Sequence, residues 1–143
     1  MRSLLNFAAF QVCWFSNVLG AAQGLPWLGP IVTATWMAAH LLNLPRHRAR
    51  REIAIEARLL VAAAALGWLA DSTLVLSGLI AFPDVARFGG PSPLWMVALW
   101  VCFAATLRHS LSCLQGRWLC GAALGATGGP LAYLGGEALG GDV

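Results

Sequence analysis

The stretch LLNFAAFQVCWFSNVLGAA, residues 4–22, decides the fold. It holds no charged side chain, and its length matches the roughly 20 mostly apolar residues that a helix needs to cross a bilayer. Asn6 and Gln11 interrupt the apolar run, and the GAAQG that ends it is a poor cleavage site for a signal peptidase. The stretch therefore predicts a first membrane helix that is not removed as a secretory signal.

The same composition extends along the whole chain. Of its 143 residues, 59% are hydrophobic and 10% are charged, whereas soluble domains carry roughly 25% charged residues. A soluble fold of this size cannot bury so much apolar surface. We therefore expect an all-α, polytopic membrane protein, a bundle of about five transmembrane helices that forms one integral membrane domain over residues 1–143. The expected helices cover residues 4–22, 26–44, 53–81, 93–114 and 119–139.

The basic residues predict the orientation of this bundle. All nine are arginines, and the densest run is RHRARR, residues 46–51. Helices that alternate in direction place three segments on one side: the N-terminus and the links between helices two and three and between four and five. These segments, with the first turns of helix three, hold every arginine except Arg87. Because short basic loops stay in the cytoplasm, we expect a cytoplasmic N-terminus and an external C-terminus.

A net charge of +3, localised in this way, does not indicate a nucleic-acid partner. The expected surroundings are the lipid bilayer, and binding of anionic lipid headgroups to the arginine run is compatible with this orientation.

Helical spacing indicates which faces meet protein. Residues seven or eleven apart lie within roughly 20° on a helix, which aligns Asn6, Cys13 and Asn17 on the first helix. On the fourth helix the same spacing aligns Trp95, Cys102, His109 and Cys113, with Thr106 beside them. Polar side chains in a membrane face protein or water, so both stripes are expected to be interior.

The fifth helix carries glycines at every fourth position: Gly121, Gly125 and Gly129. Such a ridge lets the backbone of a neighbouring helix approach closely. We expect these glycines to serve helix packing.

Several polar side chains are expected at one depth in the cytoplasmic leaflet: Asn6, His40, Glu56, Arg108 and His109. Buried charges in lipid are costly unless paired or hydrated, so these groups should meet. One interpretation pairs Glu56 with Arg108 or Arg58 and lets the histidines hydrogen-bond. A second makes His40, Glu56 and His109 metal ligands or a proton-handling set. A third lets the side chains extend to the interface. The chain lacks HxxxH and HExxH spacing, so the sequence assigns no metal and no cofactor.

Asp71 stands alone at a second depth, two-thirds along the third helix. Asn17 and Tyr133 are at a suitable depth to hydrogen-bond it. Asp71 is then either a protonated side chain that joins helices or a contact for a proton or substrate.

A resemblance supports this outline. The order LLNFAAFQVCWFSNVLGAAQGLPWLG, His40, LADSTLV, PLWMVALWVCFAATLRHSL and GGPLAYLGG resembles the bacterial inner-membrane family called domain of unknown function 2878. The resemblance runs over nearly the whole chain and implies a small multi-pass inner-membrane protein. It carries no known activity, so it implies no catalytic residue. Positions that match the recurring polar pattern of the family are Asn6, Gln11, His40, Glu56, Asp71, Thr106, His109 and Tyr133.

Three functions follow as expectations. The first is an accessory or scaffold protein of membrane lipid or envelope metabolism, with a homo-oligomer or a membrane-protein partner. The second is an intramembrane enzyme or metal-binding protein that uses His40, Glu56 and His109. The third is a small proton-coupled carrier that acts as an oligomer around Asp71.

Overall fold

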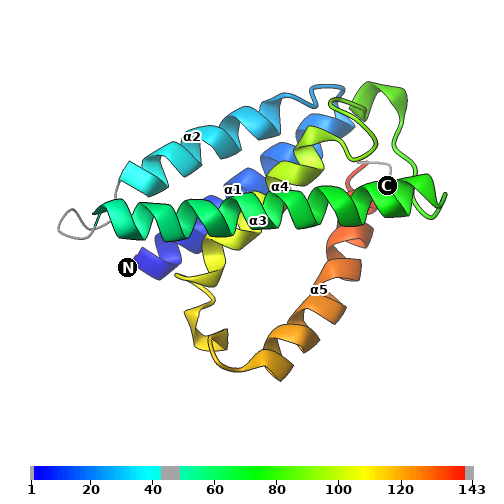
Figure 1. The fold of residues 1–143 in the computed structure, drawn as a ribbon. Coiled ribbons are helices and arrows are strands. Elements are labelled where there is room, and N and C mark those ends of the chain that lie inside the picture. The colour runs from blue at the N-terminus through cyan, green and yellow to red at the C-terminus, as the bar shows by residue number, and fades with distance from the viewer. Residues whose placement is uncertain (1, 43–48, 141–143) are drawn as a thin grey trace.

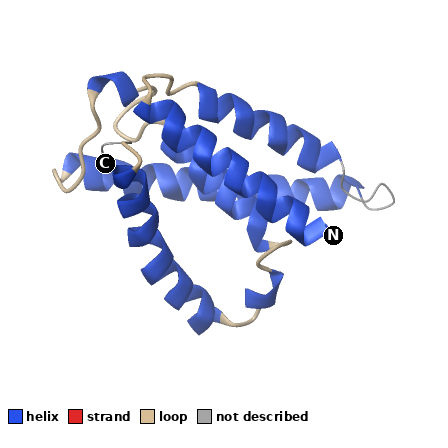
Figure 2. Cartoon of the chain, turned by 180° about the vertical axis from the view of Figure 1, so that it is seen from behind, coloured by secondary structure: helices blue, strands red, loops and turns tan. Residues whose placement is uncertain are grey.

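The computed structural model describes residues 2–42 and 49–140, and this part of the chain is helical without strands (Figures 1 and 2). The long helices are α1 (Arg2–Ala22), α2 (Leu28–Leu42), α3 (Ala49–Leu76), α4 (Leu94–Leu107) and α5 (Trp118–Ala138), and the short 3₁₀ helices are η2 (Asp84–Ala86) and η3 (Ser112–Leu114). The all-helical class with five helices is therefore confirmed. Arg46 and Arg48 of the arginine run lie outside the described residues.

Two helices end earlier than the sequence predicts. The third helix, expected to reach residue 81, ends at Leu76, because Gly78 has φ +74° and the chain reverses there. The amides of Gly78 and Leu79 bond back to the carbonyls of Val75 and Leu74, which is the pattern of a glycine-terminated helix. The fourth helix, expected to reach residue 114, ends at Leu107, and a turn leads from it into η3.

Helix α4 is the central element of the bundle. It packs against α1, α2 and α3, and α1 also packs against α2. One apolar cluster joins Val18 of α1 and Trp95 of α4 to Phe82 in the loop before η2. A second joins Met37 of α2 and Leu60 of α3 to Ala104 and Ala105 of α4. Figure 1 shows that the N-terminus, the end of α2 and the start of α3 lie together at one end of the bundle.

Helix α5 diverges from this bundle. It starts away from the other helices, and its C-terminal end returns beside the far end of α1 (Figure 1). There a Cβ on Gly135 would lie 3.7 Å from the ring of Trp14, and one on Gly140 would lie 3.8 Å from Ala22. Most side chains of α5 are exposed, and only Gly136 is classed as buried.

Several polar side chains are buried beside the apolar clusters, and many large apolar side chains are exposed. The buried polar or charged residues are Asn6, Asn17, Thr33, His40, Glu56, Asp71, Ser72, Ser92 and Thr106. Exposed large apolar residues on the same helices include Leu4, Leu5, Val12, Val61, Leu66 and Leu69. Within the described residues, two helical segments, Ser3–Ala22 and Arg50–Leu76, are long and apolar enough to cross a membrane, whereas Leu28–Leu42 and Leu94–Leu107 are apolar but shorter.

Candidate functional site

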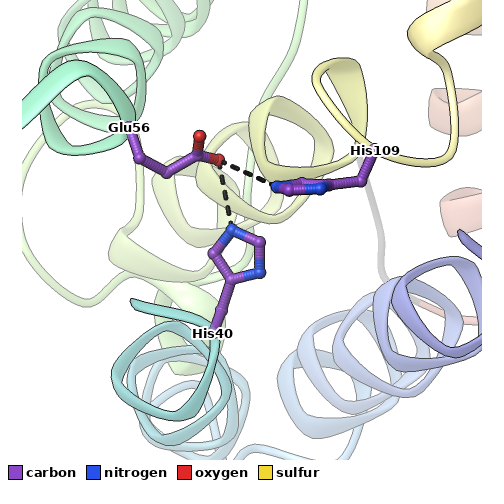
Figure 3. A group of neighbouring side chains, drawn as sticks. All are labelled: His40, Glu56 and His109. Carbon is purple, nitrogen blue, oxygen red and sulfur yellow. Dashed lines mark hydrogen bonds and ion pairs between the residues drawn. The ribbon is translucent and has the colours of Figure 1, made fainter. Parts of the chain in front are cut away.

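Three side chains from three elements converge near one end of the bundle (Figure 3). His40 lies near the end of α2, Glu56 in the second turn of α3, and His109 just after α4. Glu56 Oε1 lies 3.1 Å from His40 Nε2 and 3.7 Å from His109 Nε2. We call these three residues, with Glu52 and Arg108, the His–Glu centre. The grouping of His40, Glu56, Arg108 and His109 at one depth is as the sequence predicts.

Arg108 holds the other oxygen of Glu56. Its Nη1 donates to Glu56 Oε2 at 2.7 Å, and its Nη2 donates to Glu52 Oε2 at 3.0 Å. The guanidinium thus bridges two carboxylates that lie one turn apart on α3. Arg108, and not Arg58, is therefore the ionic partner of Glu56.

The nitrogen of His109 that faces Glu56 has no hydrogen-bond partner in the described part of the chain. Nε2 of His109 is inaccessible to solvent, although the side chain as a whole is 32% exposed. The rings of His40 and His109 meet edge to face with centroids 4.8 Å apart. Nε2 of His109 is therefore a buried polar atom that the described side chains leave unsatisfied.

The sequence places the centre by helical spacing. Met37 precedes His40 by one turn and Leu60 follows Glu56 by one turn, and both belong to the apolar cluster with Ala104 and Ala105. Burial of Met37 and Leu60 rotates α2 and α3 so that His40 and Glu56 face each other. His40 is 8% exposed and Glu56 is fully buried.

Asn6 links α1 to α4 and to the turn that follows it by hydrogen bonds. Its amide donates to the carbonyl of Ala105 at 3.3 Å, and its Oδ1 accepts from the Ser110 hydroxyl at 2.7 Å. Thr106 is buried and donates to the carbonyl of its own helix at Phe103. Gln11 is half-buried on α1 and, within the described residues, has no hydrogen bond to the His–Glu centre or to Asp71.

Asp71 forms a second, separate centre. It is fully buried, and its two oxygens accept hydrogen bonds from Trp100 Nε1 at 3.0 Å and from the Tyr133 hydroxyl at 2.5 Å. The expected contact with Tyr133 is confirmed. The expected contact with Asn17 is wrong, because the Asn17 amide donates to Thr33 Oγ1 at 3.0 Å and to the carbonyl of Cys13.

Sequence reasoning missed Glu52, Trp100 and Thr33 as members of these networks. Glu52 lies one turn before Glu56 on the same face of α3, which is a signal that the sequence does carry. The position of Trp100 opposite Asp71 depends on how α3 and α4 cross. No periodicity in the sequence reveals that crossing.

The glycine ridge on α5 faces open space. A Cβ added to Gly121, Gly125 or Gly129 would have no atom of the described residues within 4 Å. Gly121 and Gly125 instead line an apolar groove between α4 and α5, whose other walls include Phe103, Leu107 and Leu124. The ridge therefore does not serve packing within the described part of the chain.

Comparison with known proteins shows the family. No curated protein and no solved structure matches the chain. The model of the family described as a protein of unknown function, DUF2878, matches residues 3–142. Because this match covers nearly the whole sequence, the chain belongs to the DUF2878 family.

Proposed function

We propose that the chain is a multi-pass protein of the bacterial inner membrane with its N-terminus in the cytoplasm. The exposure of large apolar side chains supports this placement, since leucines such as Leu4 and Leu66 would face lipid while Glu56 and Asp71 are buried. The N-terminus, the end of α2 and the start of α3 share one end of the bundle (Figure 1). In the sequence the arginine run lies between α2 and α3, which supports the orientation.

The short helices fit this proposal because of where they lie. Helix α4 has 14 residues and α2 has 15, so at about 1.5 Å per residue each extends a little over 20 Å, less than the roughly 30 Å of a bilayer core. Non-helical backbone is tolerated at membrane depth where protein surrounds it. Helix α4 contacts α1, α2 and α3, so its flanking turns can complete the crossing inside the bundle.

Within the membrane, we infer an accessory or scaffold role that α5 performs. The observation that supports it is the open glycine ridge: the face formed by Gly121, Gly125 and Gly129 has no neighbour among the described residues. Small residues four apart allow a helix to approach closely, and close approach is what stabilises helix pairs in lipid. The proposed occupant is a transmembrane helix of another polypeptide, either a second copy or a different membrane protein.

Photo-crosslinking in native membranes tests this role. A photoreactive amino acid is placed at Leu124, which lines the groove beside Gly125. We expect a covalent adduct with a protein of defined mass, and the Gly125→Leu substitution should abolish it by separating the two helices. The mass identifies the occupant as a second copy or as a different chain.

Ala123→Leu provides the matched control. Ala123 is exposed and lies two residues before Gly125, so it faces the opposite side of α5. The control should leave the adduct intact. Adducts with lipid alone, or equal losses in the two variants, would contradict the scaffold role.

A further inference from the structure

We propose that His40, Glu56 and His109 bind a divalent transition-metal ion. Each residue offers one ligand atom, and the three atoms lie within 4.8 Å of one another. They come from α2, α3 and the turn after α4, so the site exists only in the folded bundle. The inference does not depend on whether α5 binds another helix.

The two distances from Glu56 Oε1 to the histidine nitrogens suit a metal with nitrogen and oxygen ligands. Bonds of about 2.1 Å in a tetrahedral site place neighbouring ligand atoms about 3.4 Å apart. Glu56 Oε1 stands 3.1 Å from His40 Nε2 and 3.7 Å from His109 Nε2, on either side of that value. His109 Nε2 is buried without a hydrogen-bond partner among the described residues, and a metal bond would satisfy it. Figure 3 shows both imidazoles directed at the same carboxylate oxygen.

Arg108 prepares Glu56 as a single-oxygen ligand. It binds Oε2 at 2.7 Å and leaves Oε1 directed at the two imidazoles. Hydrogen bonds to the second oxygen of a ligating carboxylate fix its orientation and commonly affect affinity for the metal. Glu52 holds the other nitrogen of Arg108 and so restrains the guanidinium. Arg108 is therefore a positioning residue and not a ligand.

The charge and the ligand types narrow the class of ion. With neutral imidazoles, the carboxylates of Glu52 and Glu56 and the guanidinium of Arg108 sum to −1, which favours a cation. Two imidazoles and one carboxylate select ions such as Zn²⁺ or Fe²⁺ over Mg²⁺ or Ca²⁺, which prefer all-oxygen sites. The three protein ligands leave the fourth position of a tetrahedral ion for a ligand that these side chains do not supply. Three protein ligands with one exchangeable position are the pattern of zinc sites that act on substrates.

The test uses the full-length protein, purified in detergent with a tag that contains no histidine and stripped of metal with a chelator. Titration with Zn²⁺ should show one ion bound per chain. Zn²⁺ should also raise the midpoint temperature of thermal unfolding, and addition of chelator should reverse this rise. His40→Ala and His109→Ala should each abolish stoichiometric binding. Arg108→Lys should retain binding but weaken it by about 10- to 100-fold.

His47→Ala is the matched control, because it removes the only other histidine of the chain. It should bind Zn²⁺ as the parent does. A parent that binds no Zn²⁺ and shows no shift in unfolding would overturn the proposal without any variant, even if the alanine variants fail to fold. Binding that survives the loss of both His40 and His109 would overturn it as well, as would loss of binding in His47→Ala.

Discussion

At the residue scale, the two buried carboxylates are stabilised by opposite means. Glu56 is held by the charged guanidinium of Arg108 and by the imidazole of His40. Asp71 accepts hydrogen bonds from neutral donors of the described helices, the indole of Trp100 and the hydroxyl of Tyr133. Because both oxygens of Asp71 are engaged by helices α4 and α5, its geometry favours the helix-joining interpretation over the carrier. In the His–Glu centre, by contrast, Nε2 of His109 has no hydrogen-bond partner among the described residues and can still bind a ligand.

Comparison of Glu56→Gln with Glu52→Gln tests how far burial controls these ion pairs. Glu56→Gln removes the buried negative charge and replaces one acceptor oxygen with an NH₂ donor. The side chain can then no longer accept from both Arg108 and His40 on separate oxygens, so the change should cost about 3 kcal/mol of unfolding free energy. Glu52 contacts the same arginine but is 27% exposed, and its loss should cost less than about 1 kcal/mol. Denaturant unfolding in detergent, without added metal, measures both. Equal effects would contradict the distinct burial of the two carboxylates.

At the element scale, the sequence predicted the number of helices better than their ends. The apolar runs have the length of membrane helices, and each one forms a helix. Gly78 was a local signal for the end of α3, because a glycine after the last apolar turn often adopts positive φ. The end of α4 carries no such residue. There Arg108 binds Glu56 on α3 and Ser110 binds Asn6 on α1, so the turn lies where these two contacts with other helices form. Contacts between distant elements cannot be derived from local propensity.

The crossing of α3 and α4 depends on Gly67. A Cβ at this position would lie 2.1 Å from Cγ of Trp100, far inside van der Waals contact. Gly67→Ala should therefore force the indole away from its hydrogen bond to Asp71 and cost about 1–3 kcal/mol. Gly121→Ala is the matched control, since no atom of the described residues lies within 4 Å of its added Cβ. Thermal unfolding with tryptophan fluorescence measures both variants. If Gly67→Ala unfolds like Gly121→Ala, the close approach at Gly67 is wrong.

At the scale of the whole molecule, the level of a residue along the helices could be predicted from the sequence. The direction in which its side chain points could not. Counting residues from helix ends placed His40, Glu56 and His109 at one level, because antiparallel helices of known rise share a common frame. Which of these side chains touch depends on helix rotation, which the buried partners Met37 and Leu60 determine. The divergence of α5 was also beyond prediction, since a glycine ridge indicates close packing without naming the partner.

The orientation of the whole molecule in the membrane is a prediction of its arginines. An alkaline phosphatase that is active only outside the cytoplasm should be active when fused after Val143 and inactive when inserted at residue 45. Replacement of Arg46, Arg48, Arg50 and Arg51 with glutamine removes most of the charge that retains this loop in the cytoplasm. This variant should give activity at both positions, because a weakened bias yields a mixed orientation. Arg87→Gln, on the other side, should leave the pattern unchanged. Activity at residue 45 in the unmodified chain would reverse the proposed orientation and place the His–Glu centre toward the outer face.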